Sequence, residues 1–446
     1  MNRQDHAVAS RSASGEAFWA AWAVVAAFGT YFCMYGFRKP FTAAGFAGDP
    51  VMGADLKAVL VASQVIGYTI SKFAGIKIVS ELPPRHRAMA IVALIAFAEG
   101  ALVLLGLLPR SWSMIALFLN GLPLGMVFGL VLGFLEGRRL TEALSAGLCA
   151  SFILAGGVSK SAGLWLLKAG VPEQWMPAAA GAMFAVPLVL GTWMLGRIPP
   201  PSPADLAERS ERTTMNGEDR RVLLKRLAPG LVPLVLMFVL LTVMRGLRDD
   251  FAPEMWRGLG VEAAPSDFAV SEFWVGLGCF AMGGAFALVR DNRKAFFGSL
   301  AACVLGFVLL ALALVLRDES VINHVPDGRD FAVRASLSPM AFMVLIGLGM
   351  YVPYVVVHTT VFERLLAVTR ERGNLAFLMS IADSCGYLGY SVIVLGKGVI
   401  ARRADFLAFF TTFAWISIGV SLVSLVGAWI YFSRRSRVLS AVPAVS

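Results

Sequence analysis

The chain has 446 residues, of which 58% are hydrophobic and 15% are charged, and its mean hydropathy is +0.73. Soluble domains are only about 45–50% apolar, so this composition excludes a soluble globular protein and indicates one that crosses a membrane many times. The formal net charge of +10 does not indicate nucleic-acid binding, because the Lys and Arg residues cluster in alternate segments between apolar runs.

Apolar runs long enough to span a bilayer recur along the whole chain, in two groups of six. A membrane-spanning helix needs roughly 20 predominantly apolar residues. The runs are 17–36, 56–80, 88–108, 112–135, 143–168 and 176–196 in the first group, and 229–248, 268–289, 295–316, 338–362, 374–400 and 405–432 in the second. The sequence therefore predicts an all-α membrane protein with twelve transmembrane helices in two six-helix halves.

A polar segment separates the two groups. It begins with Arg197-Ile-Pro-Pro-Pro-Ser-Pro, and prolines end a helix because they lack the backbone N–H that continues it. We expect this segment to be a tether between the halves that carries a surface helix. The predicted division is an N-terminal tail at 1–16, a six-helix bundle at 17–196, a linker at 197–228, a second bundle at 229–432 and a C-terminal tail at 433–446.

The basic residues predict which side of the membrane each segment faces. Most of the 39 Lys and Arg residues fall in alternate loops that share one side with both termini. Membrane proteins retain such residues on the cytoplasmic side. We therefore expect a multi-pass protein of the bacterial inner membrane with both termini and the linker in the cytoplasm. The polar loop 317–337 is expected on the opposite side.

Two arginines occupy matching positions in the two halves. Arg38 closes the first apolar run, and Arg245 lies near the end of the seventh. A charged side chain at membrane depth is costly and usually marks a substrate or ion path. The planar guanidinium stays charged there and can bind two phosphate oxygens at once. The pair predicts one anion held between the halves, whereas Lys39 is expected to reach the lipid headgroups and Arg248 to pair with Asp249 or Asp250.

Further polar residues inside the predicted helices are candidate partners of the anion. Lys72 and Lys160 would add positive charge, although each could instead form a structural ion pair. Asp383 is the candidate carboxylate for either lysine and could alternatively carry a coupling proton, whereas His358 is expected to be an ordinary core histidine. The candidate hydrogen-bond donors are Tyr35, Tyr68 and Tyr387.

The five cysteines lie within apolar runs and form no CxxC pair or Cys/His cluster. They are expected to be small core residues rather than disulfides or metal ligands. The glycines at 121, 125, 129 and 133 have the four-residue spacing of closely packed membrane helices, and no strand precedes them that would indicate a cofactor loop. We therefore expect neither a metal nor a cofactor.

Four short motifs carry a resemblance to a known family. They are Tyr31–Phe41 with its Arg38-Lys39 pair, Gly67–Phe73, the spaced set Arg245, Asp250, Phe251 and Pro253, and Gly386–Gly389. They are similar to motifs in the first, second, seventh and eleventh helices of the organophosphate:phosphate antiporter family, the glycerol-3-phosphate and hexose-phosphate transporters of the major facilitator superfamily. This resemblance implies the major facilitator fold and a phosphate-ester substrate.

The chain also departs from that family. The antiporters place a histidine in the fifth helix at the substrate, and the corresponding stretch Ser151–Lys160 contains none. The runs Leu119–Met126 and Phe134–Arg139 resemble instead an uncharacterised bacterial branch of the superfamily, a domain of unknown function. The resemblance therefore does not identify the phosphate ester.

The sequence predicts a secondary active transporter and not an enzyme. We expect it to move a small organic anion, phosphate or a phosphate ester, by alternating access and in exchange for another anion. Two alternatives remain open: a proton-coupled carrier of another organic anion, in which Asp383 or a glutamate titrates, and a non-transporting membrane sensor on the same fold. The expected partners are the anionic substrate and the lipid bilayer, with no nucleic acid, and the expected state is a monomer.

Overall fold

The computed structural model describes residues 3–46, 55–135, 141–199, 217–317, 337–369, 375–400 and 406–441. All regular secondary structure within these residues is helical. The helices of the first half are α1 (Arg3–Met34), η1 (Tyr35–Phe37), η2 (Pro40–Ala43), α2 (Leu56–Glu81), α3 (Pro84–Leu107), η3 (Arg110–Trp112), α4 (Ser113–Leu135), α5 (Thr141–Lys168) and α6 (Met176–Gly196).

The second half repeats this plan with shorter helices at several junctions. Its helices are α8 (Gly217–Asp250), α9 (Ala252–Gly258), α10 (Pro265–Ala287), α11 (Asn292–Arg317), α12 (Pro339–Val356), the π-helical turn η5 (Val357–Val361), α13 (Phe362–Thr369), α14 (Leu375–Ile400) and α15 (Phe406–Ala441). In the tenth predicted run, α12, η5 and α13 follow one another without a break. Together they form one long helix that contains a single π-helical turn.

Ten helical segments within the described residues are long and apolar enough to cross a membrane. In α1 the apolar part is the shorter stretch Ala21–Phe37, and α5 is the remaining long helix. These twelve correspond to the twelve apolar runs of the sequence. Large aromatic residues mark both ends of the first half, with Trp193 exposed at one end and Trp112 at the other, as membrane interfaces favour.

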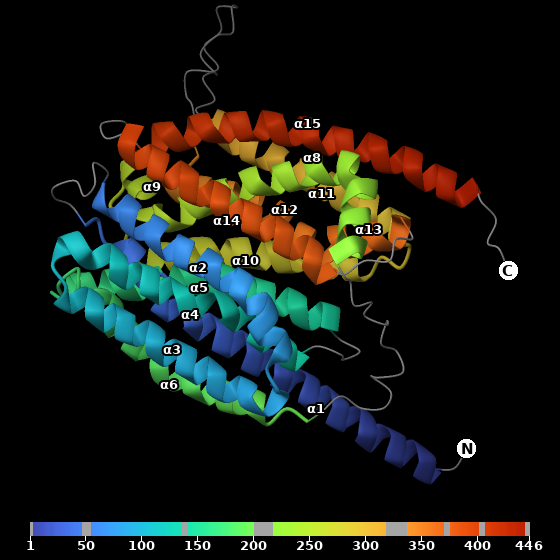
Figure 1. Ribbon diagram of the computed structural model, residues 1–446, viewed down its shortest axis with the longest axis horizontal. Coiled ribbons are helices and arrows are strands. Elements are labelled where there is room, and N and C mark those ends of the chain that lie inside the picture. The colour runs from blue at the N-terminus through green and yellow to red at the C-terminus, as the bar shows by residue number, and fades with distance from the viewer. Residues whose placement is uncertain are drawn as a thin grey trace, which may run out of the picture.

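The helices form a single elongated bundle whose two halves lie one above the other in the view of Figure 1. Between the halves, α5 packs against α10 and α2 packs against α14. The beginning of α1 and the end of α15 lie at the same end of the bundle, which we call the terminal end. We call the opposite end, where α1 and α8 finish, the far end.

Glycines allow the helices that carry the polar residues to approach closely. A Cβ atom at Gly121 of α4 would lie 2.1 Å from the carbonyl oxygen of Gln64 in α2. At Gly386 of α14 it would lie 2.8 Å from the hydroxyl of Thr242 in α8. Small residues of this kind let membrane helices pack by backbone contact. They fix α2 against α4, and α14 against α8.

The predicted linker 197–228 is described only in part. Residues 217–228 form the first turns of α8, so this end of the predicted linker is continuous with the seventh long helix. Here the carbonyl of Arg226 accepts hydrogen bonds from the hydroxyl of Tyr431 at 2.8 Å and from Arg435 at 3.0 Å, both on α15. Residues 200–216 and most of the predicted loop 317–337 lie outside the described residues.

The arrangement predicts opposite exposure for the two ends of the bundle. A cysteine replacing Arg110, at the far end between α3 and α4, should react with an impermeant thiol reagent in intact cells. A cysteine replacing Arg290, at the terminal end between α10 and α11, should react only after lysis, because the basic side is retained in the cytoplasm. Labelling in the reverse order would overturn the orientation.

Candidate functional site

Arg38 lies where the first helix unwinds. After α1 ends at Met34, the chain turns through η1, and the side chain of Arg38 remains 5% exposed. Its guanidinium carbon lies 4.0 Å from the ring centroid of Tyr68 and 5.7 Å from that of Tyr35. These distances are those of cation–π contacts. The guanidinium is therefore held against two aromatic faces inside the bundle.

Two side-chain amides support the unwound segment. The side-chain nitrogen of Gln64 donates to the carbonyl of Arg38 at 3.0 Å, and that of Asn120 donates to the carbonyl of Phe37 at 3.1 Å. Gln64 also donates to the amide oxygen of Asn120 at 2.7 Å. Backbone carbonyls without helical partners must be satisfied inside a membrane protein. This pair of amides therefore fixes the backbone from which Arg38 projects.

Arg245 lies in the corresponding part of the second half, on α8 and 6% exposed. Its guanidinium carbon lies 4.4 Å from the ring centroid of Tyr354 and 5.9 Å from that of Tyr351, both on α12. One terminal nitrogen lies 3.5 Å from the hydroxyl of Tyr387, at the outer limit of a hydrogen bond. Like Arg38, it is surrounded mainly by tyrosines.

Tyr68 and Tyr387 connect the two arginines across the boundary between the halves. Their ring centroids are 5.2 Å apart in an edge-to-face contact between α2 and α14. Tyr68 contacts Arg38, and Tyr387 approaches Arg245. Tyr35 and Tyr387 each interact electrostatically with both guanidinium groups. We call Arg38 and Arg245 the central arginine pair.

The central arginine pair has no acidic partner in the part of the chain that the structure describes. Neither guanidinium forms an ion pair there, and the Nε–H of each is buried without a hydrogen-bond partner. A buried charge is ordinarily paired, because its transfer out of water is otherwise very costly. Two such groups at one place provide donors and positive charge suited to an anion.

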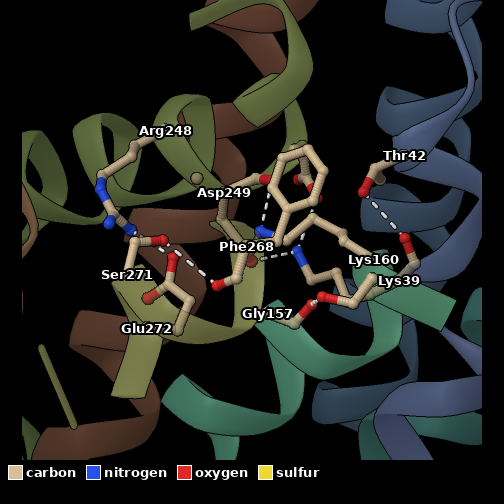
Figure 2. Close-up of polar contacts among 12 residues, drawn as sticks. Lys39, Thr42, Gly157, Lys160, Arg248, Asp249, Phe268, Ser271 and Glu272 are labelled. Carbon is tan, nitrogen blue, oxygen red and sulfur yellow. Dashed lines mark hydrogen bonds and ion pairs between the residues drawn. The ribbon is translucent and has the colours of Figure 1, made fainter. Parts of the chain in front are cut away.

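Three ion pairs join the halves between this site and the far end of the bundle. The ammonium group of Lys39 lies 2.5 Å from an oxygen of Asp249 and 2.5 Å from one of Asp250. The other oxygen of Asp249 lies 2.5 Å from the ammonium group of Lys160. Figure 2 shows both lysine side chains approaching Asp249. The expectation that Lys39 reaches the headgroups is therefore wrong, because its side chain is buried.

Two further contacts extend this layer. The ammonium group of Lys57 binds both carboxylate oxygens of Glu254, at 2.7 and 2.9 Å. The hydroxyl of Tyr390 donates to Asp250 at 2.7 Å. We call the whole set the far-end network: Lys39, Lys57, Lys160, Asp249, Asp250, Glu254 and Tyr390. It closes the space between the halves at the far end, and Lys160 belongs to it rather than to the central arginine pair.

Arg248 does not contribute to the far-end network. It is fully buried, lies 2.6 Å from Glu272 and donates to the carbonyl of Met343 at 2.9 Å, all within the second half. Figure 2 shows it directed away from Asp249, its neighbour in sequence. Successive residues of a helix point about 100° apart, which separates the two roles. The expected pairing of Arg248 with Asp249 or Asp250 is therefore wrong.

A second ionic cluster lies toward the terminal end. Lys72, one helical turn beyond Tyr68 on α2, lies 2.5 Å from Asp383, which lies one turn before Tyr387 on α14. The ring nitrogen Nε2 of His358 lies 3.2 Å from the other oxygen of Asp383. We call Lys72, His358 and Asp383 the terminal-side triad. Asp383 thus pairs with Lys72, and the expectation of an ordinary core histidine at 358 misses this contact.

Two tyrosines of α12 also lie at the site and were not among the residues expected there. Tyr351, Tyr354 and His358 follow one another at spacings of three and four residues, which place side chains on one face of a helix. That face meets Arg245 and Asp383. The spacing was a usable signal, but it cannot be told from an ordinary aromatic packing face without knowing what lies opposite.

Comparisons with known proteins agree with this architecture. A model of a family described as a family of unknown function, DUF5690, matches residues 40–435. No curated protein matches the sequence. A crystal structure of the D-xylose–proton symporter superposes with a TM-score of 0.60 at 12% identity, covering 92% of this chain and 96% of that one.

At this identity the structural match shows the fold alone. It confirms the predicted all-α major facilitator fold with twelve transmembrane helices in two six-helix halves, and a multi-pass membrane protein. The symporter is not an organophosphate antiporter, and the matching family has no assigned function. The closer resemblance to the organophosphate:phosphate antiporters therefore stays a prediction.

Replacing Asp249 by Ala should destabilise the folded protein strongly. The change leaves the buried Lys160 without a carboxylate, and breaking a buried ion pair from one side costs about 3–5 kcal/mol. We expect a lower melting temperature in detergent than for Glu262→Ala, which removes an exposed carboxylate. Adding Lys160→Met to Asp249→Ala should recover part of the loss, and equal melting temperatures for the two single variants would contradict the assignment.

Proposed function

Because the chain belongs to the DUF5690 family, whose function is unknown, and has the major facilitator fold, we propose that it is a secondary active transporter of a small anion. The proposed substrate is phosphate or a phosphate ester. It would cross the bacterial inner membrane by alternating access and in exchange for another anion. The basic loops support a cytoplasmic location for both termini.

The observation that carries this proposal is the central arginine pair. Two buried guanidinium groups, one from each half, have tyrosines around them and no described carboxylate. A phosphate ester carries close to two negative charges at neutral pH and has three strong acceptor oxygens. It would neutralise both guanidinium groups and accept hydrogen bonds from them. Phenol hydroxyls such as that of Tyr387 are additional donors at the same place.

The two ionic layers on either side suggest how access alternates. The far-end network joins the halves on one side of the arginines, and the Lys72–Asp383 contact joins them on the other. Opening the site to either side requires the corresponding layer to separate while the other remains closed. Lys160 and Lys39 then act as parts of a seal, and the anion is bound by the arginines and tyrosines between the layers.

The same charges favour exchange over one-way transport. With the site empty, two guanidinium groups from opposite halves share one aromatic cluster. Like charges in such a site repel each other. A bound dianion removes this repulsion and stabilises the closed arrangement through which the carrier must pass. The occupied carrier should therefore change sides more easily than the empty one, which makes transport depend on an anion in each direction.

Proton-coupled transport is the second candidate, and one observation favours it. Asp383 contacts a histidine as well as Lys72, within the same central region. A carrier driven by protons needs a group inside the membrane that gains and loses a proton during its cycle. The two candidates differ in whether an internal anion is required for uptake.

Replacing Arg245 by Lys should weaken phosphate-ester binding about tenfold or more. Lysine keeps the charge but loses the two-pronged geometry, and a hydrogen bond to a charged group contributes about 1.5–3 kcal/mol. Isothermal titration of the purified protein with glycerol 3-phosphate measures the effect. The matched control is Arg257→Lys, an exposed arginine at the far end. Unchanged affinity in Arg245→Lys would refute the arginine site.

Uptake into proteoliposomes should depend on an anion inside. Vesicles loaded with phosphate should take up labelled phosphate ester rapidly, and empty vesicles should take up little, because the unoccupied arginines repel each other. The measurement is made with and without an imposed pH gradient. Rapid uptake into empty vesicles that is driven by the gradient and abolished by Asp383→Asn would reject exchange and favour proton symport.

A further inference from the structure

His358 lies in the only π-helical turn of the described residues, within an otherwise α-helical rod. π-Helical turns are rare and are frequently found at functional sites. The turn directs His358 toward Asp383, with 11% of its side chain exposed. Its ring also lies against two aromatic rings, those of Tyr354 and Phe238, at centroid distances of 4.4 and 5.2 Å.

The hydrogen bonds of His358 determine how many protons its ring carries. Nδ1 lies 3.0 Å from the backbone carbonyl of Tyr354, which can only accept, so Nδ1 carries a hydrogen. Nε2 lies 3.2 Å from a carboxylate oxygen of Asp383. If Nε2 were bare, two lone pairs would face each other at this distance. A favourable contact therefore requires a proton between His358 and Asp383.

That proton belongs on the histidine. The ammonium group of Lys72 donates to the second oxygen of Asp383 at 2.5 Å, and a carboxylate with such a partner favours its ionised form. His358 is then an imidazolium that donates from both nitrogens. Histidine is the side chain that ordinarily changes its charge between pH 5 and 8. The geometry thus provides a place for one proton between the ring and the carboxylate.

The other groups around the pair show what this proton depends on. The charged or titratable side chains that interact with Asp383, among the described residues, are Lys72 and Tyr68 of α2, Tyr354 of α12 and Tyr387 of α14. Arg245 of α8 contacts the same Tyr354 ring as His358 does. With His358 protonated, the triad has one more positive than negative charge. The central arginine pair, whose members contact the neighbouring rings of Tyr68 and Tyr354, brings the excess in this region to three positive charges when no anion is bound.

We propose that His358 and Asp383 form a proton-binding site that is occupied together with the anion at the central arginine pair. A bound dianion lowers the local positive charge and so stabilises the imidazolium, whereas an empty site favours its deprotonation. Tyr354 connects the two sites, since its ring lies 4.4 Å from both Arg245 and the His358 ring. The linkage between proton and anion rests on the proposed anion site. The assignment of a proton to His358 rests only on the hydrogen bonds of its ring and does not need that site.

The proposal predicts the direction in which pH changes the affinity for the anion. Because binding free energies are reciprocal, an anion that favours protonation must itself bind more tightly when His358 is protonated. Affinity should then be higher at pH 6 than at pH 8, by at most tenfold per pH unit for one linked proton. Sulfate is the suitable probe, because it keeps two negative charges over this range and a phosphate ester does not.

The test combines nuclear magnetic resonance of protein with ¹⁵N-labelled histidine and titration with sulfate. The His358 signals are identified by their loss in His358→Gln, with His86→Gln as the exposed control. Without anion, we expect an imidazolium signal at pH 6, and added sulfate should preserve this signal to higher pH. In His358→Gln, sulfate should still bind, but its affinity should change less between pH 6 and pH 8 than in the wild type.

Each outcome separates the two proposals. A His358 ring that stays neutral from pH 6 to pH 8 would refute the proton site whether or not sulfate binds. A midpoint that sulfate leaves unchanged, although calorimetry shows binding, would refute the linkage. Absence of sulfate and phosphate-ester binding in the wild type refutes the anion site of the proposed function, while the titration of His358 in anion-free protein still decides the protonation of the ring.

Discussion

The arrangement of charge between the two halves depends on one constraint: burying a cationic side chain that has no carboxylate partner is unfavourable in free energy. Lys39, Lys57, Lys160 and Arg248 are all buried, and each has a carboxylate within 2.7 Å. Arg38 and Arg245 are buried to a similar degree and have tyrosine rings instead. Carboxylates are therefore present at this depth, but they pair with the other buried cations and not with the central arginine pair. A neutral far end and a positive centre follow from that distribution, and the proposed anionic substrate has the charge that such a centre would bind.

Much of this could be predicted from the sequence, for physical reasons. The twelve helices follow from runs of apolar residues, because a bilayer admits few alternatives to a helix. Arg38 and Arg245 stand out because charge at membrane depth is rare. The pairing of the other charges could not be predicted. Asp249 and Asp250 follow each other in sequence, yet which lysine each meets depends on how α1, α5 and α8 are rotated about their axes.

The histidine illustrates the limit of arguing from a resemblance. The antiporters place a histidine at the substrate from the fifth helix, and the corresponding stretch here contains none. In this fold a histidine approaches the same region from the opposite half, on a π-helical turn of the tenth helix. A π-helical turn such as Val357–Val361 changes the direction of the side chains locally, and the spacing of apolar residues in the sequence does not reveal it. The histidine of this region therefore comes from a different helix than the resemblance implied.

The continuity of α8 has a mechanical consequence. This helix carries Arg245 near one end and the basic residues from Gly217 onward at the other, and Tyr431 and Arg435 bind it to α15 there. At 1.5 Å per residue its 34 residues make a lever about 50 Å long, and a tilt of about 5° displaces one end by about 4 Å relative to the other. The prolines at 229 and 233 provide a place where such a rod can bend. In the proposed transport cycle, a movement of α8 at Arg245 would therefore also displace the contact with α15 at the other end of the helix.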